Sequence, residues 1–222
     1  MSTTRSNSRN NSAPSGVAAV LTLAAVIAAY WEGFSPTGYA DPVGIPTVCW
    51  GHTGPDVRVG MTLSLSQCRD LLQKDLVIAA SAVERCITRP LSTHQAAAFT
   101  SFTFNVGGGA FCGSTLVRLF NAGQEEEACR QMSRWIYAKG VKLRGLERRR
   151  AAEVSLCLNG SWTPPDGRVP TSPLGKAGFV PHVVATVGVD DVGNSVLDRA
   201  AERGILPVVH QYSSGQIQQR AA

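Results

Sequence analysis

Three arrangements of hydrophobic and polar residues follow one another along this chain. Residues 16–31 form an uncharged, mostly apolar run, and residues 39–53 combine prolines, glycines and β-branched residues. From there to about residue 158, hydrophobic residues recur at spacings of three and four. These patterns predict an apolar helix, then a compact antiparallel hairpin, then a series of amphipathic helices.

Polar residues at the ends of these stretches predict several helix boundaries. Ser64 with Gln67, and Ser92 with Gln95, have the spacing of a capping box, in which each side chain binds a backbone N–H group at the start of a helix. The Asn-Gly pair at residues 159–160 predicts the end of the last helix.

The N-terminal residues have the layout of an export signal. Residues 1–15 are polar and carry Arg5 and Arg9 with no acidic residue, and the uncharged run follows. Its 16 residues span about 24 Å as a helix, shorter than the roughly 30 Å hydrocarbon layer, and six of them are alanine. We expect a marginal membrane helix with its N-terminus in the cytoplasm. A cleaved signal peptide and a buried helix of the globular domain are the two alternatives.

Composition narrows the class of protein. The 222 residues are 44% hydrophobic and 17% charged, which supports a buried core and excludes a wholly disordered chain. The net charge of +5 is a mild basic excess without a dense basic stretch and interleaved aromatic residues, so we expect no nucleic-acid partner. Six cysteines, an even and high count, indicate an oxidising compartment.

Two acidic residues and a threonine stand where the apolar run meets the predicted hairpin. Glu32 directly follows the run, Asp41 lies nine residues later, and Thr47 lies six residues after that. Glycoside hydrolysis needs such a pair of carboxyl groups, one to protonate the leaving oxygen and one to activate or position water. Spacing by itself favours the simpler interpretation of a surface acid and a turn aspartate before Pro42.

The residues around this pair resemble a known family. The segment WEGFSPTGYADPVGIPTVCWGHTG, with the pattern E-x8-D-x5-T, resembles the catalytic segment of the phage-type lysozymes, glycoside hydrolase family 24. Similar segments follow in the family's order: SFTFNVGGGAF at 101–111, SRWIYAKG at 133–140 and LRGLERRRAAE at 143–153. The resemblance covers roughly residues 24–158 and implies an α+β lysozyme-like fold, with a small β-hairpin lobe facing a larger helical lobe.

The resemblance also implies a reaction. Glu32 matches the family's general acid, Asp41 the carboxylate that holds the attacking water, and Thr47 the hydroxyl that helps to orient it. The implied enzyme is a phage endolysin that hydrolyses the β-1,4 bond between N-acetylmuramic acid and N-acetylglucosamine of peptidoglycan during host lysis, as a monomer and without metal or cofactor. Two alternatives remain: a membrane-tethered peptidoglycan-binding protein without catalysis, and a lysozyme-fold enzyme acting on chitin-like chains.

One residue departs from the family pattern. Pro46 precedes Thr47 where many members carry an aromatic or other ladder-forming residue. Because proline has no backbone N–H group to pair with a neighbouring strand, we expect an exposed edge of the hairpin at this position.

The cysteines are expected to form three disulfide bonds. Many pairings of six cysteines are possible, and each bond is expected to contribute about 3 kcal/mol by restricting the unfolded chain. The way cysteines co-occur in similar proteins implies the pairs Cys49 with Cys68, Cys86 with Cys112, and Cys129 with Cys157.

The family's first helix leads into its catalytic glutamate, and here the last turns of the apolar run supply that helix. Cleavage after Ala29 would leave Glu32 three residues from a new terminus. The resulting hypothesis gives residues 16–31 two roles. The run first anchors the chain in the inner membrane with its catalytic domain in the periplasm, then leaves the bilayer when the membrane potential collapses and packs into the released domain.

The chain is therefore expected to have four parts. A polar tail (1–15) precedes the signal-anchor helix (16–31), and the lysozyme catalytic domain covers residues 32–158. Residues 159–222 are a Pro-rich linker and C-terminal extension of unknown role, since their apolar content is too low for a core of their own.

Two further polar residues have competing interpretations. His52 lies in a GHTG turn, where a hydrogen-bonded structural role is favoured over a catalytic one. Asn105 is a candidate substrate-binding residue, since amides at such positions bind N-acetyl sugars in similar proteins, and capping of a helix end explains it equally well.

Two larger groups are expected to be structural. Four aromatic residues at helical spacing are predicted in the core rather than on a sugar platform: Phe102, Phe104, Trp135 and Tyr137. A basic cluster could attract the anionic wall, but a solvated helix face with acidic neighbours is favoured. Its members are Arg144, Arg148, Arg149 and Arg150, with Glu147 and Glu153 as neighbours.

Overall fold

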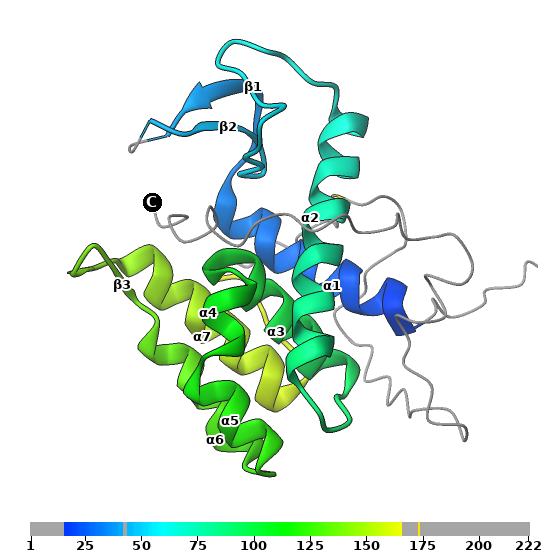
Figure 1. The fold of residues 1–222 in the computed structure, drawn as a ribbon, viewed down its shortest axis with the longest axis vertical. Coiled ribbons are helices and arrows are strands. Elements are labelled where there is room, and N and C mark those ends of the chain that lie inside the picture. Colours follow the sequence, from blue (N-terminus) through cyan, green and yellow to red (C-terminus); the bar gives the residue numbers. More distant parts are fainter. Residues whose placement is uncertain (1–15, 42–43, 166–172, 174–222) are drawn as a thin grey trace, which may run out of the picture.

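The computed structural model of the chain describes residues 16–41, 44–165 and 173, which form two unequal lobes bridged by a long helix (Figure 1). The polar tail and most of the C-terminal extension lie outside the described residues. In chain order the elements are α1 (Gly16–Glu32), β1 (Ser35–Ala40), β2 (Pro46–Cys49), α2 (Leu65–Cys86), α3 (Thr93–Val106), α4 (Gly108–Cys112), α5 (Thr115–Asn121), α6 (Glu125–Gln131), the 3-10 helix η1 (Met132–Arg134), β3 (Tyr137–Ala138), β4 (Val141–Lys142) and α7 (Arg144–Asn159).

The small lobe is built on the antiparallel pair β1 and β2. Tyr39 lies opposite Thr47, and Ala40 lies opposite Pro46, which is the first residue of β2. Both strands are edges of a two-stranded sheet, so a proline at the start of β2 is tolerated as the sequence predicts. The loop that follows packs closely on β1, because a Cβ atom on Gly38 would lie only 2.3 Å from the carbonyl oxygen of Arg58.

Both predicted capping boxes are present. The hydroxyl groups of Ser64 and Ser92 accept hydrogen bonds from the backbone of Gln67 and Gln95, and both glutamine side chains bind back to the capping residues. They start α2 and α3 one residue later. α3 ends before Gly107, whose φ of 86° few other residues adopt, and α4 begins immediately afterwards.

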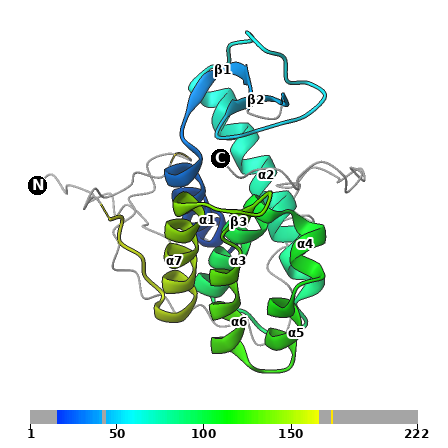
Figure 2. The same cartoon turned by 90° about the vertical axis from the view of Figure 1, so that its left-hand side faces the viewer.

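Helix α1 is buried between two groups of hydrophobic side chains, and Figure 2 shows it beside α7 and α3. Ala24, Ala25 and Ala28 have no exposed surface and pack toward α2 and the hairpin, while Ile27 joins the core around α3. Burial on two sides explains why this helix is apolar around its circumference. Its small side chains also let neighbouring helices approach closely.

The apolar run is therefore a helix of the domain, as both the buried-helix alternative and the second role of the signal-anchor hypothesis predict. Within the described part of the chain, no helix combines the length and hydropathy that crossing a membrane requires.

The core of the large lobe surrounds α3, which packs against α1, α2 and α7. Phe99 and Phe102 are fully buried and meet Phe111 and Phe120 with ring centroids 5.3 to 6.4 Å apart. Phe102 and Phe104 are thus core residues, as predicted.

The expectation of a core position is wrong for Tyr137, which is 60% exposed. It belongs to a second hairpin, β3 and β4, inside a region predicted to be entirely helical. Lys139 and Gly140, with φ of 49° and 79°, form the two-residue turn that positive φ angles favour. Strands of two residues are too short to produce an alternating pattern in the sequence.

Three disulfide bonds connect the elements, in the pairings that the family resemblance implies. Cys49–Cys68 joins β2 to α2, Cys86–Cys112 joins α2 to α4, and Cys129–Cys157 joins α6 to α7. Their Cα–Cα distances of 5.2, 5.5 and 5.8 Å fit disulfide geometry. The first of these bonds ties the hairpin lobe to the bridging helix.

The first residues of the extension return to α1. The ring of Trp162 lies 5.2 Å from that of Tyr30 and 6.5 Å from that of Trp31. The packed part of the chain therefore continues a few residues past Asn159, where α7 ends.

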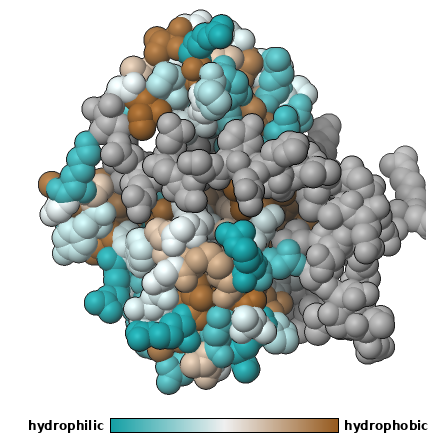
Figure 3. All heavy atoms as spheres, viewed as in Figure 1, coloured by the Kyte–Doolittle hydropathy of each residue, from teal (hydrophilic) through white to brown (hydrophobic). Residues whose placement is uncertain are grey.

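On the face shown in Figure 3, hydrophobic and hydrophilic residues are interspersed over both lobes.

Candidate active site

Glu32 is the last residue of α1, and the chain continues from it into the hairpin lobe. Its side chain is 14% exposed, and its Oε1 accepts a hydrogen bond from Nη1 of Arg149 at 2.6 Å. The two residues are 117 positions apart in the sequence. The apolar helix thus brings Glu32 to the lobe boundary, and α7 fixes the direction of its carboxyl group.

Asp41 and Thr47 are held by local contacts in the hairpin. Oδ1 of Asp41 accepts a hydrogen bond from the backbone N–H group of Ile45 at 2.8 Å, and the Asp41 N–H group donates to the Ile45 carbonyl at 3.0 Å. The hydroxyl group of Thr47, a buried residue, donates to the same carbonyl at 3.0 Å. One residue of the turn, Ile45, therefore orients both side chains.

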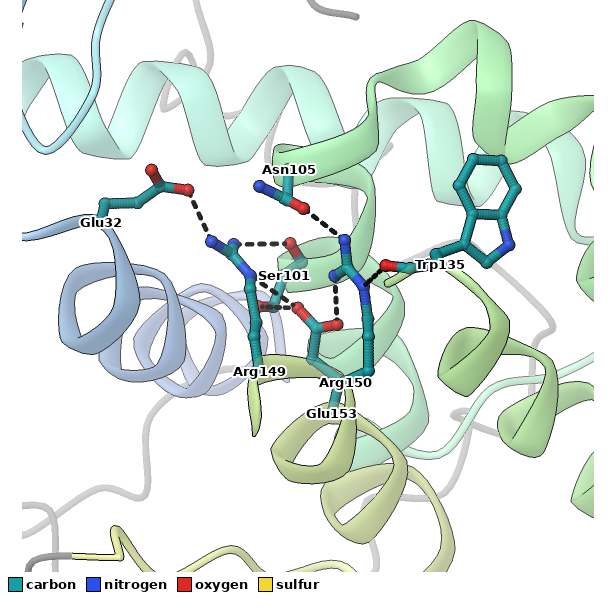
Figure 4. A network of polar contacts seen from close by, with 7 residues as sticks. All are labelled: Glu32, Ser101, Asn105, Trp135, Arg149, Arg150 and Glu153. Carbon is teal, nitrogen blue, oxygen red and sulfur yellow. Dashed lines mark hydrogen bonds and ion pairs between the residues drawn. The ribbon is translucent and has the colours of Figure 1, made fainter. Parts of the chain in front are cut away.

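Behind Glu32 lies a buried network of charged groups (Figure 4). Arg149, 3% exposed, donates through Nε to Oε1 of Glu153 at 3.1 Å and through Nη2 to the carbonyl oxygen of Ser101 at 3.2 Å. Glu153 has no exposed surface, and its Oε1 also accepts a hydrogen bond from the Ser101 hydroxyl group at 2.9 Å. The guanidinium of Arg149 therefore joins α1, α3 and α7.

The network continues to Asn105 through a second arginine. Arg150 donates through Nη1 to Oε2 of Glu153 at 2.5 Å, through Nε to the carbonyl oxygen of Trp135 at 3.1 Å, and through Nη2 to Oδ1 of Asn105. Its guanidinium carbon also lies 4.6 Å from the ring centre of Phe102. Since the amide oxygen of Asn105 faces Arg150, the amide nitrogen is turned away from that guanidinium.

The two arginines differ in their electrostatics. Burial works most strongly against the charge of Arg149, but the carboxylates of Glu32 and Glu153 outweigh it together and raise the pKa of Arg149. Burial lowers the pKa of Arg150, which has the carboxylate of Glu153 beside it and the positive charge of Arg149 nearby. Both guanidinium groups stay protonated at neutral pH, so the network contains two positive charges.

The expectation that Arg149, Arg150 and Glu153 lie on a solvated helix face is wrong. All three are buried, with Arg150 only 1% exposed. The sequence did contain a signal for this position, because Leu146, Leu156 and these charged residues recur at spacings of three and four and share the buried side of α7. Charged residues in line with apolar ones indicate a buried ion-pair network rather than a wet surface.

His52 has the contacts of a structural residue, as the sequence favoured. Its Nδ1 lies 2.9 Å from Oδ2 of Asp75 on α2, and Asp56 lies nearby, with 3.7 Å from its Oδ2 to Nε2. The pair with Asp75 links the hairpin lobe to α2. Within the described ranges, no cluster of three or more histidine, cysteine, aspartate and glutamate residues is arranged to hold a metal ion.

Comparison with known proteins identifies the family. The model of the family described as "Phage lysozyme" matches residues 29–153, more than half of the chain. The chain belongs to the phage lysozyme family. The matched residues of this lysozyme include Glu32, Asp41 and Thr47 together with the arginine network.

Relatives of this phage lysozyme include endolysins of several phages. The SAR-endolysin of Bacteriophage PS119 is 42% identical over 129 residues, which cover 58% of this chain and 77% of the relative. The SAR-endolysin of Pseudomonas phage phiKMV is 34% identical over 151 residues, covering 66% and 91%. Among solved structures, the endolysin from Escherichia coli O157:H7 phage FAHEc1 matches with a TM-score of 0.59 and 29% identity, covering 65% of this chain and 94% of that one. The α+β lysozyme-like fold is thereby confirmed, and the chain is a lysozyme-type enzyme.

Proposed function

We propose that this chain is a phage endolysin that hydrolyses the β-1,4 bond between N-acetylmuramic acid and N-acetylglucosamine in peptidoglycan. Glu32 is the general acid that protonates the leaving oxygen, and Asp41 with Thr47 positions the attacking water. Membership of the phage lysozyme family supports the enzyme class. The observation that carries the assignment of roles is the different support of the two carboxyl groups.

The support of Glu32 suits a group that must aim at one oxygen atom. A general acid acts within hydrogen-bonding distance of the atom that it protonates, so its direction matters. The contact of 2.6 Å with a buried guanidinium fixes that direction.

The support of Asp41 and Thr47 suits the holding of a water molecule. One oxygen of Asp41 binds the Ile45 N–H group, and a carboxylate has further acceptor sites for water. The Thr47 hydroxyl donates to the Ile45 carbonyl, which leaves its oxygen lone pairs as acceptors. A water held between these groups would donate its protons to them and direct its own lone pair at the sugar.

Hydrolysis of purified peptidoglycan by wild type and Glu32→Gln tests this proposal. We expect the rate of release of reducing ends to fall at least about 10²-fold in Glu32→Gln, the lower end of what a general acid contributes, while sedimentation with insoluble wall persists. Glu126→Gln, at an exposed position of α6, is the matched control and should keep the wild-type rate. Wall binding without hydrolysis by wild type would favour the binding-protein alternative, and preferred cleavage of chitin oligomers would favour the third.

We also propose that α1, which does not combine the length and hydropathy of a stable membrane span, anchors the chain marginally in the inner membrane before release to the periplasm, where it acts as a monomer. The short, alanine-rich sequence of this helix supports an exchange between bilayer and protein, since the same residues pack between two cores. Replacing Ala24 and Ala25 with leucine should retain the chain in the membrane fraction and suppress lysis. Ala18→Leu adds a leucine at an exposed position of α1 and is the comparison variant. Retention of this variant in the membrane fraction would result from the higher hydropathy of the helix, whereas an effect confined to positions 24 and 25 would result from overpacking of the folded domain.

A further inference from the structure

Glu153 is a fully buried carboxylate that contacts two guanidinium groups and one hydroxyl group. Oε1 accepts from Ser101 and Arg149, and Oε2 accepts from Arg150 at 2.5 Å. Burial of a carboxylate is costly unless its charge is paired and hydrogen-bonded, and here both oxygens are bound. Figure 4 shows Glu153 between the two arginines.

Each arginine reaches a different candidate site residue. Arg149 donates hydrogen bonds to both Glu153 and Glu32, which is on α1. Arg150 donates to both Glu153 and Asn105, which is on α3. The two arginines are adjacent on α7, so without a common partner their guanidinium groups would repel each other. By binding both guanidinium groups, Glu153 holds that of Arg149 against Glu32 on α1 and that of Arg150 against Asn105 on α3.

The charges of the network depend on the protonation of Glu32. Arg149 and Arg150 contribute two positive charges, and Glu153 contributes one negative charge. An ionised Glu32 neutralises the remainder, whereas a protonated Glu32 leaves one net positive charge. The other elements packed on α1 here are α3, which presents neutral Ser101 and Asn105, and α2, which meets it through apolar residues such as Leu72 and Leu76. Asp41 of the hairpin is the further charged group of the proposed site.

We propose that Glu153 is a positioning residue for the hydrolysis: it orients Glu32 through Arg149 and Asn105 through Arg150, and its negative charge balances part of the positive charge of the two guanidinium groups. This inference rests on the function proposed above. Loss of the Glu153 charge would leave Glu32 facing a more positive network, which favours the ionised carboxylate and removes the proton that the leaving oxygen needs. Loss of one arginine charge would have the opposite effect.

The pH dependence of kcat/KM on peptidoglycan fragments separates this role from simple stabilisation. A general acid becomes inactive as pH rises and its proton is lost, so the alkaline limb of the profile reports its ionised fraction. We expect Glu153→Gln to move this limb to lower pH by about one unit. KM should rise, because Arg150, the partner of Asn105, loses the carboxylate that fixes it. Arg150→Gln, which keeps Glu153 and removes a positive charge, should move the limb to higher pH.

Leu156→Ala, a buried neighbour on α7 outside the network, is the control for loss of stability. It should lower the melting temperature and leave the alkaline limb in place. If the limbs of Glu153→Gln and Arg150→Gln both coincide with that of wild type, Glu153 is only structural and the inference is overturned. If Glu153→Gln does not fold, the alkaline limb of Arg150→Gln is the test. A limb at higher pH than that of wild type supports the proposal, and an unmoved limb contradicts it. Absence of hydrolysis by wild type would instead contradict the proposed function.

Discussion

The two proposed carboxyl groups of the site are held in opposite ways. Asp41 is oriented by Ile45, four residues further along the chain, in a turn of a two-stranded sheet. Glu32 is oriented by Arg149, which lies 117 residues away and is itself fixed by a buried carboxylate. The hairpin lobe therefore builds its half of the site from local backbone contacts, whereas the helical lobe builds its half from packing between distant helices.

Because of this difference, substitutions in the two halves of the site should affect folding stability and catalysis to different extents. A change in the hairpin removes contacts that are local and partly exposed, and it should affect catalysis more than folding. A change in the arginine network disturbs groups buried among α1, α3 and α7, and it should affect both. Four experiments examine this contrast, from the largest expected effect to the smallest.

Asp41→Asn should lower kcat by about 10²- to 10⁴-fold, since an amide is a poor base for positioning and activating water. The unfolding free energy should fall by only about 1 kcal/mol, because the side-chain oxygen that binds Ile45 is retained. Initial rates on purified wall and urea denaturation measure the two quantities. A loss of stability as large as that of a core substitution would contradict the local character of the hairpin half.

Arg149→Met should lower the unfolding free energy by about 3 kcal/mol or more, since it breaks a buried ion pair and leaves Glu153 with one guanidinium partner. Arg130→Met is the matched control, because Arg130 pairs with Glu126 on an exposed face of α6 and such pairs contribute at most about 1 kcal/mol. The denaturant midpoints of Arg149→Met and Arg130→Met, measured with the disulfides intact, compare the two losses of unfolding free energy. Equal losses would show that the buried network has no special weight.

Removing the Cys49–Cys68 bond by a double substitution to alanine should cost about 3 kcal/mol and also lower activity, since this bond ties the hairpin to α2. Removing Cys129–Cys157 should cost a similar amount of stability with a smaller loss of activity, because that bond lies within the helical lobe. Thermal unfolding and wall hydrolysis of the two variants test the contrast. The same loss of activity in both would mean that the hairpin lobe needs no such attachment.

The smallest effect concerns His94, at the start of α3. Burial lowers its pKa below the ordinary value of 6.5, so the unfolded chain takes up the proton first as pH falls. This contribution to stability is present above about pH 6.5 and is lost as pH falls through the lower pKa of the folded chain. His94→Gln should therefore reduce the stability difference between pH 7 and pH 5 in denaturation experiments. An unchanged difference would assign the acid sensitivity of the helical lobe to other groups.

The same contrast explains which features could be predicted from the sequence. The hairpin half depends on residues close together in the chain, so one short pattern contains Asp41 and Thr47, together with Glu32 at the end of α1, and the serine capping boxes are equally local. The second hairpin was missed because its strands have two residues each. The arginine network was missed because a spacing of three or four residues occurs both on wet helix faces and on buried ones. The alignment of these charged residues with Leu146 and Leu156 was the signal of burial, and the packing of α7 against α3 confirms it.

Hydrolysis of purified peptidoglycan in H₂¹⁸O, followed by mass spectrometry of the soluble fragments, tests the central claim most directly. The account predicts one ¹⁸O atom at C1 of the new N-acetylmuramic acid ends with wild type, and almost none with Glu32→Gln. Label at N-acetylglucosamine ends or in the peptide stems, or equal labelling by both proteins, would contradict it.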